Sequence, residues 1–124
     1  MKNTKQINEI ELNKDNVYEF IKFAKESLEL KEKVNVKLLT QRDEQMTAAC
    51  YNPSTNEISI YTKGRAFADV CRSLAHEMVH QKQNELGLLE EDSGNIGSDI
   101  ENEANACAGI LMRNFGKIVE NLYD

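Results

Sequence analysis

Residues 66–86 read AFADVCRSLAHEMVHQKQNEL, and this stretch decides the fold that the sequence predicts. Successive residues of an α-helix are about 100° apart, so apolar residues spaced by three or four share one face. The apolar face here consists of Phe67, Val70, Cys71, Leu74 and Met78. We therefore predict a long helix over residues 66–86. Because polar residues occupy its other side, we expect this helix to form a central layer, with a sheet against the apolar face.

Both histidines of the 124-residue chain lie in this helix, within the motif HEMVH at residues 76–80. Residues four apart stack one turn above each other, so His76 and His80 can reach one cation at about 2.0 to 2.1 Å, the usual zinc–nitrogen distance. Glu77 lies on a neighbouring face, where its carboxylate can act as the general base that activates water in zinc peptidases. The motif thus predicts a Zn²⁺ site with Glu77 as its catalytic residue.

Two other interpretations of the motif stay open at this point. In the first, the helix is solvated and carries two ordinary surface histidines, which leaves their spacing unexplained. In the second, the site binds zinc without turning over a substrate, because a motif fixes ligands better than it fixes activity. Hydrolysis is the interpretation that we favour.

The third metal ligand must come from a residue that is not histidine. A catalytic zinc usually has three protein ligands, and the start of the last predicted helix offers Asp99, Glu101 and Glu103. Ser98 and Glu101 have the spacing of a capping box, which gives Glu101 a structural role. Glu103 borders the predicted apolar face of this helix, which consists of Ile100, Ala104, Cys107, Leu111 and Ile118. We therefore predict Glu103 as the third ligand, with Asp99 in reserve.

The rest of the chain predicts one small α+β domain over residues 1–124. Residues 15–30 have helical apolar spacing, and residues 99–121 form the last helix. Between the first two helices, residues 34–39 and two segments on either side of the turn PSTN are predicted strands. We expect them to form a short antiparallel sheet packed on the motif helix.

Composition limits the classes of partner. The formal net charge is −6, and basic residues are dispersed among acidic ones, which argues against a nucleic-acid or anionic-membrane surface. The first residues lack the apolar segment of a signal peptide, and no run is long enough for a membrane span, so we expect a cytoplasmic protein. The three cysteines, which have no CxxC spacing, are expected to be reduced. We expect a monomer.

The motif HEMVH, followed 23 residues after His80 by EANACAGILM at residues 103–112, resembles the ImmA/IrrE-type metallopeptidases of the zincin superfamily. That family pairs HExxH with a later helix of pattern EANxFAxxLLMP. The matching residues are Glu103, Ala104, Asn105, Ala108 and Leu111. Cys107 lies where the family pattern has Phe. Arg113 differs from the Met and Pro with which that pattern ends. The likeness covers residues 50–112. The chain also has a weaker similarity to the SprT and Spartan proteases, but it lacks the third histidine that those proteases use.

This resemblance implies a zincin-like, HExxH gluzincin-like fold, a glutamate as third ligand, and a cytoplasmic peptidase that cleaves a regulatory protein, often in phage or mobile-element settings. We therefore expect a zinc endopeptidase that hydrolyses a protein or peptide substrate. The strand at residues 57–62 is expected to bind that substrate in extended form by strand addition. The acidic residues Glu90, Glu91 and Asp92 are either a site for basic side chains or a solvated loop. The alternative function is a catalytically inactive zinc-binding module that docks a protein partner.

Overall fold

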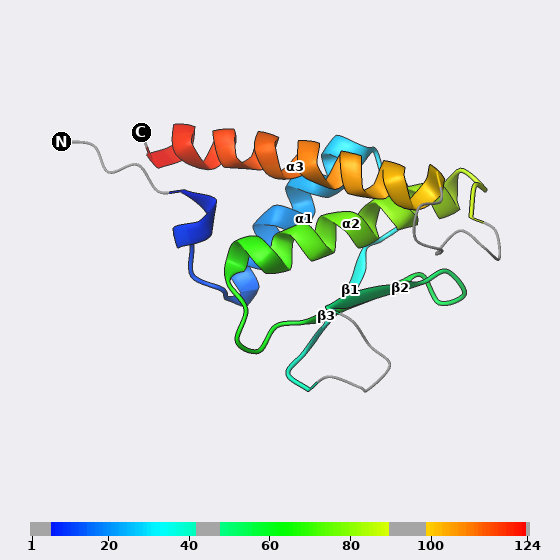
Figure 1. Ribbon diagram of the computed structural model, residues 1–124, viewed down its shortest axis with the longest axis horizontal. Coiled ribbons are helices and arrows are strands. Elements are labelled where there is room, and N and C mark those ends of the chain that lie inside the picture. The colour runs from blue at the N-terminus through cyan, green and yellow to red at the C-terminus, as the bar shows by residue number, and fades with distance from the viewer. Residues whose placement is uncertain (1–5, 42–47, 90–98, 124) are drawn as a thin grey trace.

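The chain forms an α+β fold, as the sequence predicts (Figure 1). The computed structural model describes residues 6–41, 48–89 and 99–123, with side chains up to residue 120. Its elements in chain order are a short 3-10 helix η1 (Ile7–Glu9), helix α1 (Lys14–Leu28), strands β1 (Asn35–Leu39), β2 (Ala49–Asn52) and β3 (Glu57–Tyr61), and helices α2 (Phe67–Glu85) and α3 (Asp99–Tyr123). The acidic residues 90–92 lie outside the described residues, so their two interpretations stay open.

The sheet is mixed, which corrects the expectation of an antiparallel sheet. Its strand order is β1-β3-β2: β2 pairs with β3 antiparallel, whereas β1 pairs with β3 parallel. Alternating side chains indicate that a segment is a strand but carry no information on the direction of its neighbour. Because β3 is the central strand, residues 57–62 cannot add a substrate strand, and that prediction is wrong. Within the described residues, β1 and β2 are the edges.

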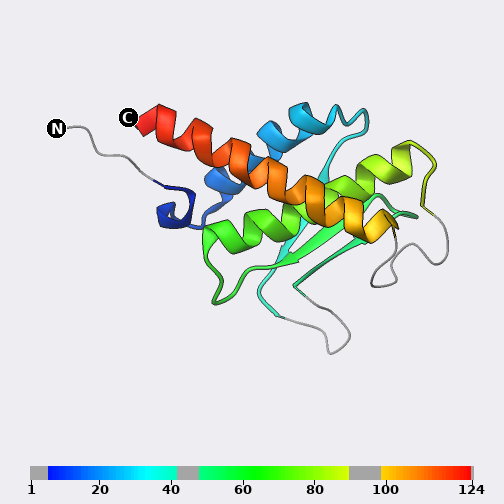
Figure 2. The ribbon, with the colours of Figure 1, turned by 45° about the horizontal axis from the view of Figure 1, so that its top comes forward.

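Helix α2 lies between α3 and the sheet, as Figures 1 and 2 show from two directions. It also contacts α1, so it is covered on more sides than a simple sandwich requires. All members of its predicted apolar face are buried, namely Phe67, Val70, Cys71, Leu74 and Met78. An aromatic group made of Phe20, Phe23, Phe67 and Phe115 joins the three helices at one end of the core.

Helix α3 is rotated relative to its prediction, and this rotation matters for the site. Its buried residues are Ala104, Ala108, Leu111, Met112, Phe115 and Val119. Ala104 and Leu111 are therefore placed as expected, whereas Ile118 is 44% exposed and Ile100 and Cys107 are only half-buried. Glu101 precedes Ala104 by one turn and so lies on the buried face of the helix. That position directs Glu101, rather than Glu103, toward His76 and His80 of α2.

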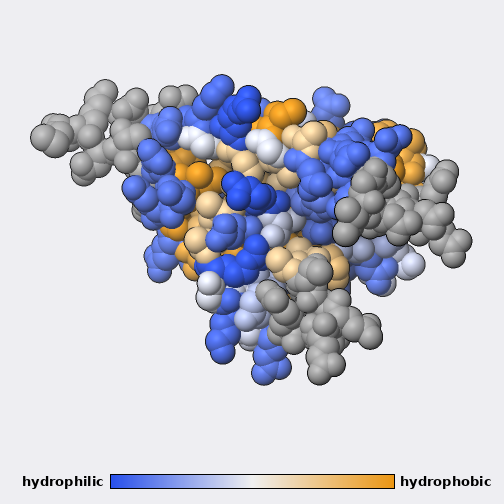
Figure 3. All heavy atoms as spheres, in the orientation of Figure 1, coloured by the Kyte–Doolittle hydropathy of each residue, from blue (hydrophilic) through white to orange (hydrophobic). Residues whose placement is uncertain are grey.

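The helices of the described residues include none that is both long and apolar enough to cross a membrane. On the face shown in Figure 3, hydrophilic residues surround small and separate hydrophobic areas. The described cysteines, Cys50, Cys71 and Cys107, are all free thiols.

Candidate metal centre

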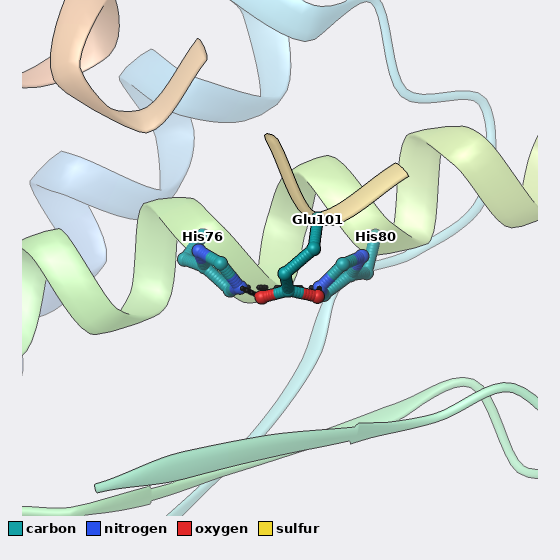
Figure 4. Close-up of side chains that lie close together, drawn as sticks. All are labelled: His76, His80 and Glu101. Carbon is teal, nitrogen blue, oxygen red and sulfur yellow. Dashed lines mark hydrogen bonds and ion pairs between the residues drawn. The ribbon is translucent and has the colours of Figure 1, made fainter. Parts of the chain in front are cut away.

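His76 and His80 lie one turn apart on α2, and their rings face the same point (Figure 4). The ring centroids are 4.8 Å apart and the two Nε2 atoms are 3.2 Å apart. The helical spacing alone brings the rings together, because residues four apart are neighbours on one side of a helix. This part of the predicted site is present as the sequence indicates.

Glu101 supplies the third side chain of the group from the first turn of α3 (Figure 4). Its Oε1 lies 2.6 Å from Nε2 of His76, and its Oε2 lies 3.2 Å from Nε2 of His80. One ligand atom from each of the three residues lies within 4.8 Å of the others, so the group is close enough to bind a metal ion. All three side chains are partly buried, which limits competition from water.

The spacing of the two histidine nitrogens suits a tetrahedral ion. Two nitrogen ligands at about 2.0 to 2.1 Å from zinc, separated by the tetrahedral angle, are about 3.3 Å from each other. The two Nε2 atoms are 3.2 Å apart, close to that value. Two imidazoles and one carboxylate also form a donor set typical of catalytic zinc, which leaves a fourth position open. The residues present therefore fit a zinc ion.

A hydrogen-bond chain determines the tautomer of the neutral His80 ring. Gln83 is only 1% exposed, and its Nε2 donates to the carbonyl oxygen of Ile100 at 3.0 Å and to Oε1 of Glu103 at 2.9 Å. A carbonyl only accepts, so the amide nitrogen must face α3 and the amide oxygen must face His80. Nδ1 of His80, 2.8 Å from that oxygen, then carries a proton and donates it. In the neutral ring Nε2 is left unprotonated, which is the form that binds a metal.

The prediction that Glu103 is the third ligand needs correction. The structure brings Glu101 to the histidines, whereas the Glu103 carboxylate accepts a hydrogen bond from Gln83. Glu103 therefore acts on the site through Gln83 and His80, from outside the group of three. Asp99, the reserve candidate, is exposed and is not part of the group. Ser98, the other residue of the predicted capping box, lies outside the described residues, so that prediction stays open.

Glu77 lies beside the group in a buried position. It is 9% exposed, and it lines a hollow of about 330 Å³. The hollow is also lined by Ala48, Ala49, Arg72, Ser73, His76 and Glu101. Burial, with a smaller contribution from the Glu101 charge, raises the pKa of Glu77 to about 7. A carboxyl group with a pKa near neutrality, open to a hollow beside three metal-ligand atoms, has the properties that a general base requires.

The raised pKa predicts how the metal-free protein responds to pH. The pKa of Glu77 is about 7 when folded and has its ordinary value of 4.5 when unfolded, so the folded state binds the extra proton between these values. The free energy of unfolding of chelator-treated protein should therefore fall by about 3 kcal/mol as pH rises from 4.5 to above 7. Urea unfolding of wild type and Glu77→Gln at pH 5 and pH 8 measures this difference. Identical pH dependence in both proteins would contradict the raised pKa of Glu77.

No protein-family model, curated protein or solved structure matches the chain. Sequence reasoning missed Gln83 and Arg72 as members of the surroundings. Gln83 follows His80 by three residues, a spacing that places two side chains together on a helix, and this signal was present in the sequence.

Proposed function

We propose that this chain is a zinc-dependent endopeptidase of the zincin type. His76, His80 and Glu101 hold the zinc ion, and Glu77 is the general base. The observation that carries the proposal is the convergence of three candidate ligand atoms beside a buried carboxyl group that lines the same hollow. The motif HEMVH and its resemblance to ImmA/IrrE-type metallopeptidases support the same function. A zinc ion in this position supplies a Lewis acid that polarises a peptide carbonyl and lowers the pKa of water.

Glu77 accounts for the proton transfers of peptide hydrolysis. Its carboxylate accepts the proton of the attacking water and then donates it to the nitrogen of the leaving amine. A pKa of about 7 for Glu77 in the metal-free chain places both forms within reach near neutral pH. A nearby positive ion lowers that pKa and favours the carboxylate that begins the reaction.

Strand β2 is the element best placed to bind an extended substrate. It forms an edge of the sheet within the described residues, and Ala48 and Ala49, at its start, line the hollow with His76 and Glu77. An extended peptide can add to such an edge through main-chain hydrogen bonds. We therefore move the strand-addition site from β3, which is central, to β2.

Removal of the metal tests the proposal. Zinc-loaded protein should cleave an unfolded protein such as reduced, alkylated casein, and treatment with a chelator should abolish cleavage, because the Lewis acid is lost. Addition of one equivalent of zinc should restore it, as measured by gel electrophoresis and mass spectrometry of the products. Stoichiometric zinc binding without cleavage would instead support the alternative function, an inactive zincin-like module that docks a protein partner.

A further inference from the structure

Arg72 is a cation beside the candidate site with no partner among the residues that the structure describes. It is exposed, it precedes His76 by one turn of α2, and it lines the hollow that Glu77 and Glu101 also line. Within residues 6–41, 48–89 and 99–120, its side chain makes no hydrogen bond or ion pair. Among the described residues that line this hollow, it is the one lysine or arginine.

Arg65, in the same region, is an arginine whose hydrogen bonds give it a structural role. Its guanidinium donates to the carbonyl oxygens of Ala48, Tyr61 and Asp69 at 3.4, 2.9 and 3.0 Å, and to Oγ of Ser73 at 2.7 Å. Arg65 thereby joins the start of β2, the end of β3 and the first turns of α2. Arg72 makes no such contacts with the described part of the chain, which leaves its guanidinium available to a molecule that enters the hollow.

The chemistry of the guanidinium selects the group that it would bind. Its planar set of N–H donors matches a carboxylate, with which it forms two parallel hydrogen bonds. The chain as a whole has a net charge of −6, and the other charged residues that line the hollow, Glu77 and Glu101, are acidic. Such surroundings repel most anions, so an anionic group of a substrate is favoured only where it meets Arg72.

The direction of β2 determines which side of the scissile bond lies near Arg72. Strand β2 runs in the same direction as α2: its start lies beside Arg72 and Ser73, whereas the Tyr51 hydroxyl, near its end, accepts a hydrogen bond from Asn84 at 3.0 Å. A peptide that adds antiparallel to β2 therefore runs toward the N-terminal end of α2. Its residues on the C-terminal side of the scissile bond approach Arg72.

The distance gives the position of the contacted residue. The point between His76 and His80 is six residues from Arg72, or about 9 Å along a helix with a rise of 1.5 Å. An extended peptide advances about 3.3 Å per residue, so the same length corresponds to two or three residues. Resting on the proposed function, we propose that Arg72 is a specificity-determining residue that binds a substrate carboxylate two or three residues to the C-terminal side of the scissile bond. Either an Asp or Glu side chain or the terminal carboxylate of a peptide could supply this group.

Synthetic peptides can test this assignment directly. The probe is a fluorescent Ala/Ser-rich peptide with an amidated C-terminus and a single Glu, and matched peptides carry Gln or Lys at that place. A further peptide ends at that place with a free carboxylate, which distinguishes the two sources. Mass spectrometry should map cleavage two or three bonds before the Glu. The ratio of kcat/KM for the Glu and Lys peptides should fall about two- to fivefold in Arg72→Gln, and on the order of tenfold in Arg72→Glu.

Arg113→Glu is the matched control, because Arg113 is exposed on α3 and does not line the hollow. This substitution makes the same change of charge as Arg72→Glu, and it should leave the ratio of kcat/KM for the Glu and Lys peptides unaltered. An unchanged ratio in Arg72→Glu, or an equal change in Arg113→Glu, would overturn the assignment while hydrolysis itself still supports the proposed function.

A binding measurement separates the two proposals if wild type cleaves none of these peptides. Fluorescence anisotropy with zinc-loaded Glu77→Gln should show tighter binding of the Glu peptide than of the Lys peptide, and Arg72→Glu in the same background should reverse that order. That result would support Arg72 as the carboxylate-binding residue although the peptidase proposal had failed. Equal affinities, or no binding of either peptide, would overturn it.

Discussion

Replacement of Glu101 by alanine is expected to weaken zinc binding by more than about 100-fold and to abolish hydrolysis. Loss of a residue that only orients a ligand typically costs about 10- to 100-fold in metal affinity, and loss of a ligand itself should cost more. Glu101 lies 2.6 and 3.2 Å from the two Nε2 atoms, close enough to supply a third ligand atom. Competition titration against a chromophoric chelator measures the affinity of the variant and of wild type.

Glu103→Ala is the control that separates the two glutamates. Glu103 reaches the site only through Gln83 and His80, so its loss should weaken zinc binding by no more than the about 10- to 100-fold typical of an orienting residue. Normal zinc affinity in Glu101→Ala, combined with severe loss in Glu103→Ala, would reverse the assignment. It would restore Glu103 as the ligand that the family resemblance implies.

Glu77→Gln is expected to retain zinc and to lose peptide hydrolysis. The amide is nearly isosteric with the carboxyl group but cannot accept a proton from water, so kcat should fall by at least about 100-fold. Parallel measurements of zinc content and of cleavage of a fluorogenic peptide test both parts of the expectation. Glu120→Gln, on the exposed face of α3, provides a control with the same chemical change.

Two results would count against the role of Glu77. Turnover within a few-fold of wild type would remove it from the mechanism. Loss of zinc together with activity would assign it to metal binding instead, although Glu77 is not part of the group formed by His76, His80 and Glu101.

The elements of the fold were predictable, but their arrangement was only partly so. The apolar period of residues 66–86 indicates α2 because burial of one face requires side chains three and four residues apart. Alternation of side chains with a period of two locates the strands in a similar way. Strand order and direction depend on contacts between distant segments, such as the parallel pairing of Val36 with Ile58, and no local pattern encodes them.

The candidate site was also only partly predictable from the sequence. His76 and His80 could be assigned from sequence because one helix positions both side chains. Glu101 could not, because its choice over Glu103 depends on the rotation of α3 against α2, and a shift of two residues turns a side chain by about 200°. The segment ANACAG at residues 104–109 has small side chains on several faces, so its apolar pattern does not define that rotation.

The candidate site takes its side chains from two helices that are separated in the chain by residues 86–98, so a zinc ion bound there would link the stability of the protein to its metal supply. An ion held by α2 and α3 together binds the folded chain and not the unfolded one. At a free zinc concentration 100 times the dissociation constant, this adds about 2.7 kcal/mol to the free energy of unfolding. Zinc scarcity would then expose the chain to degradation as well as silence it, so its abundance in a cell would follow zinc availability.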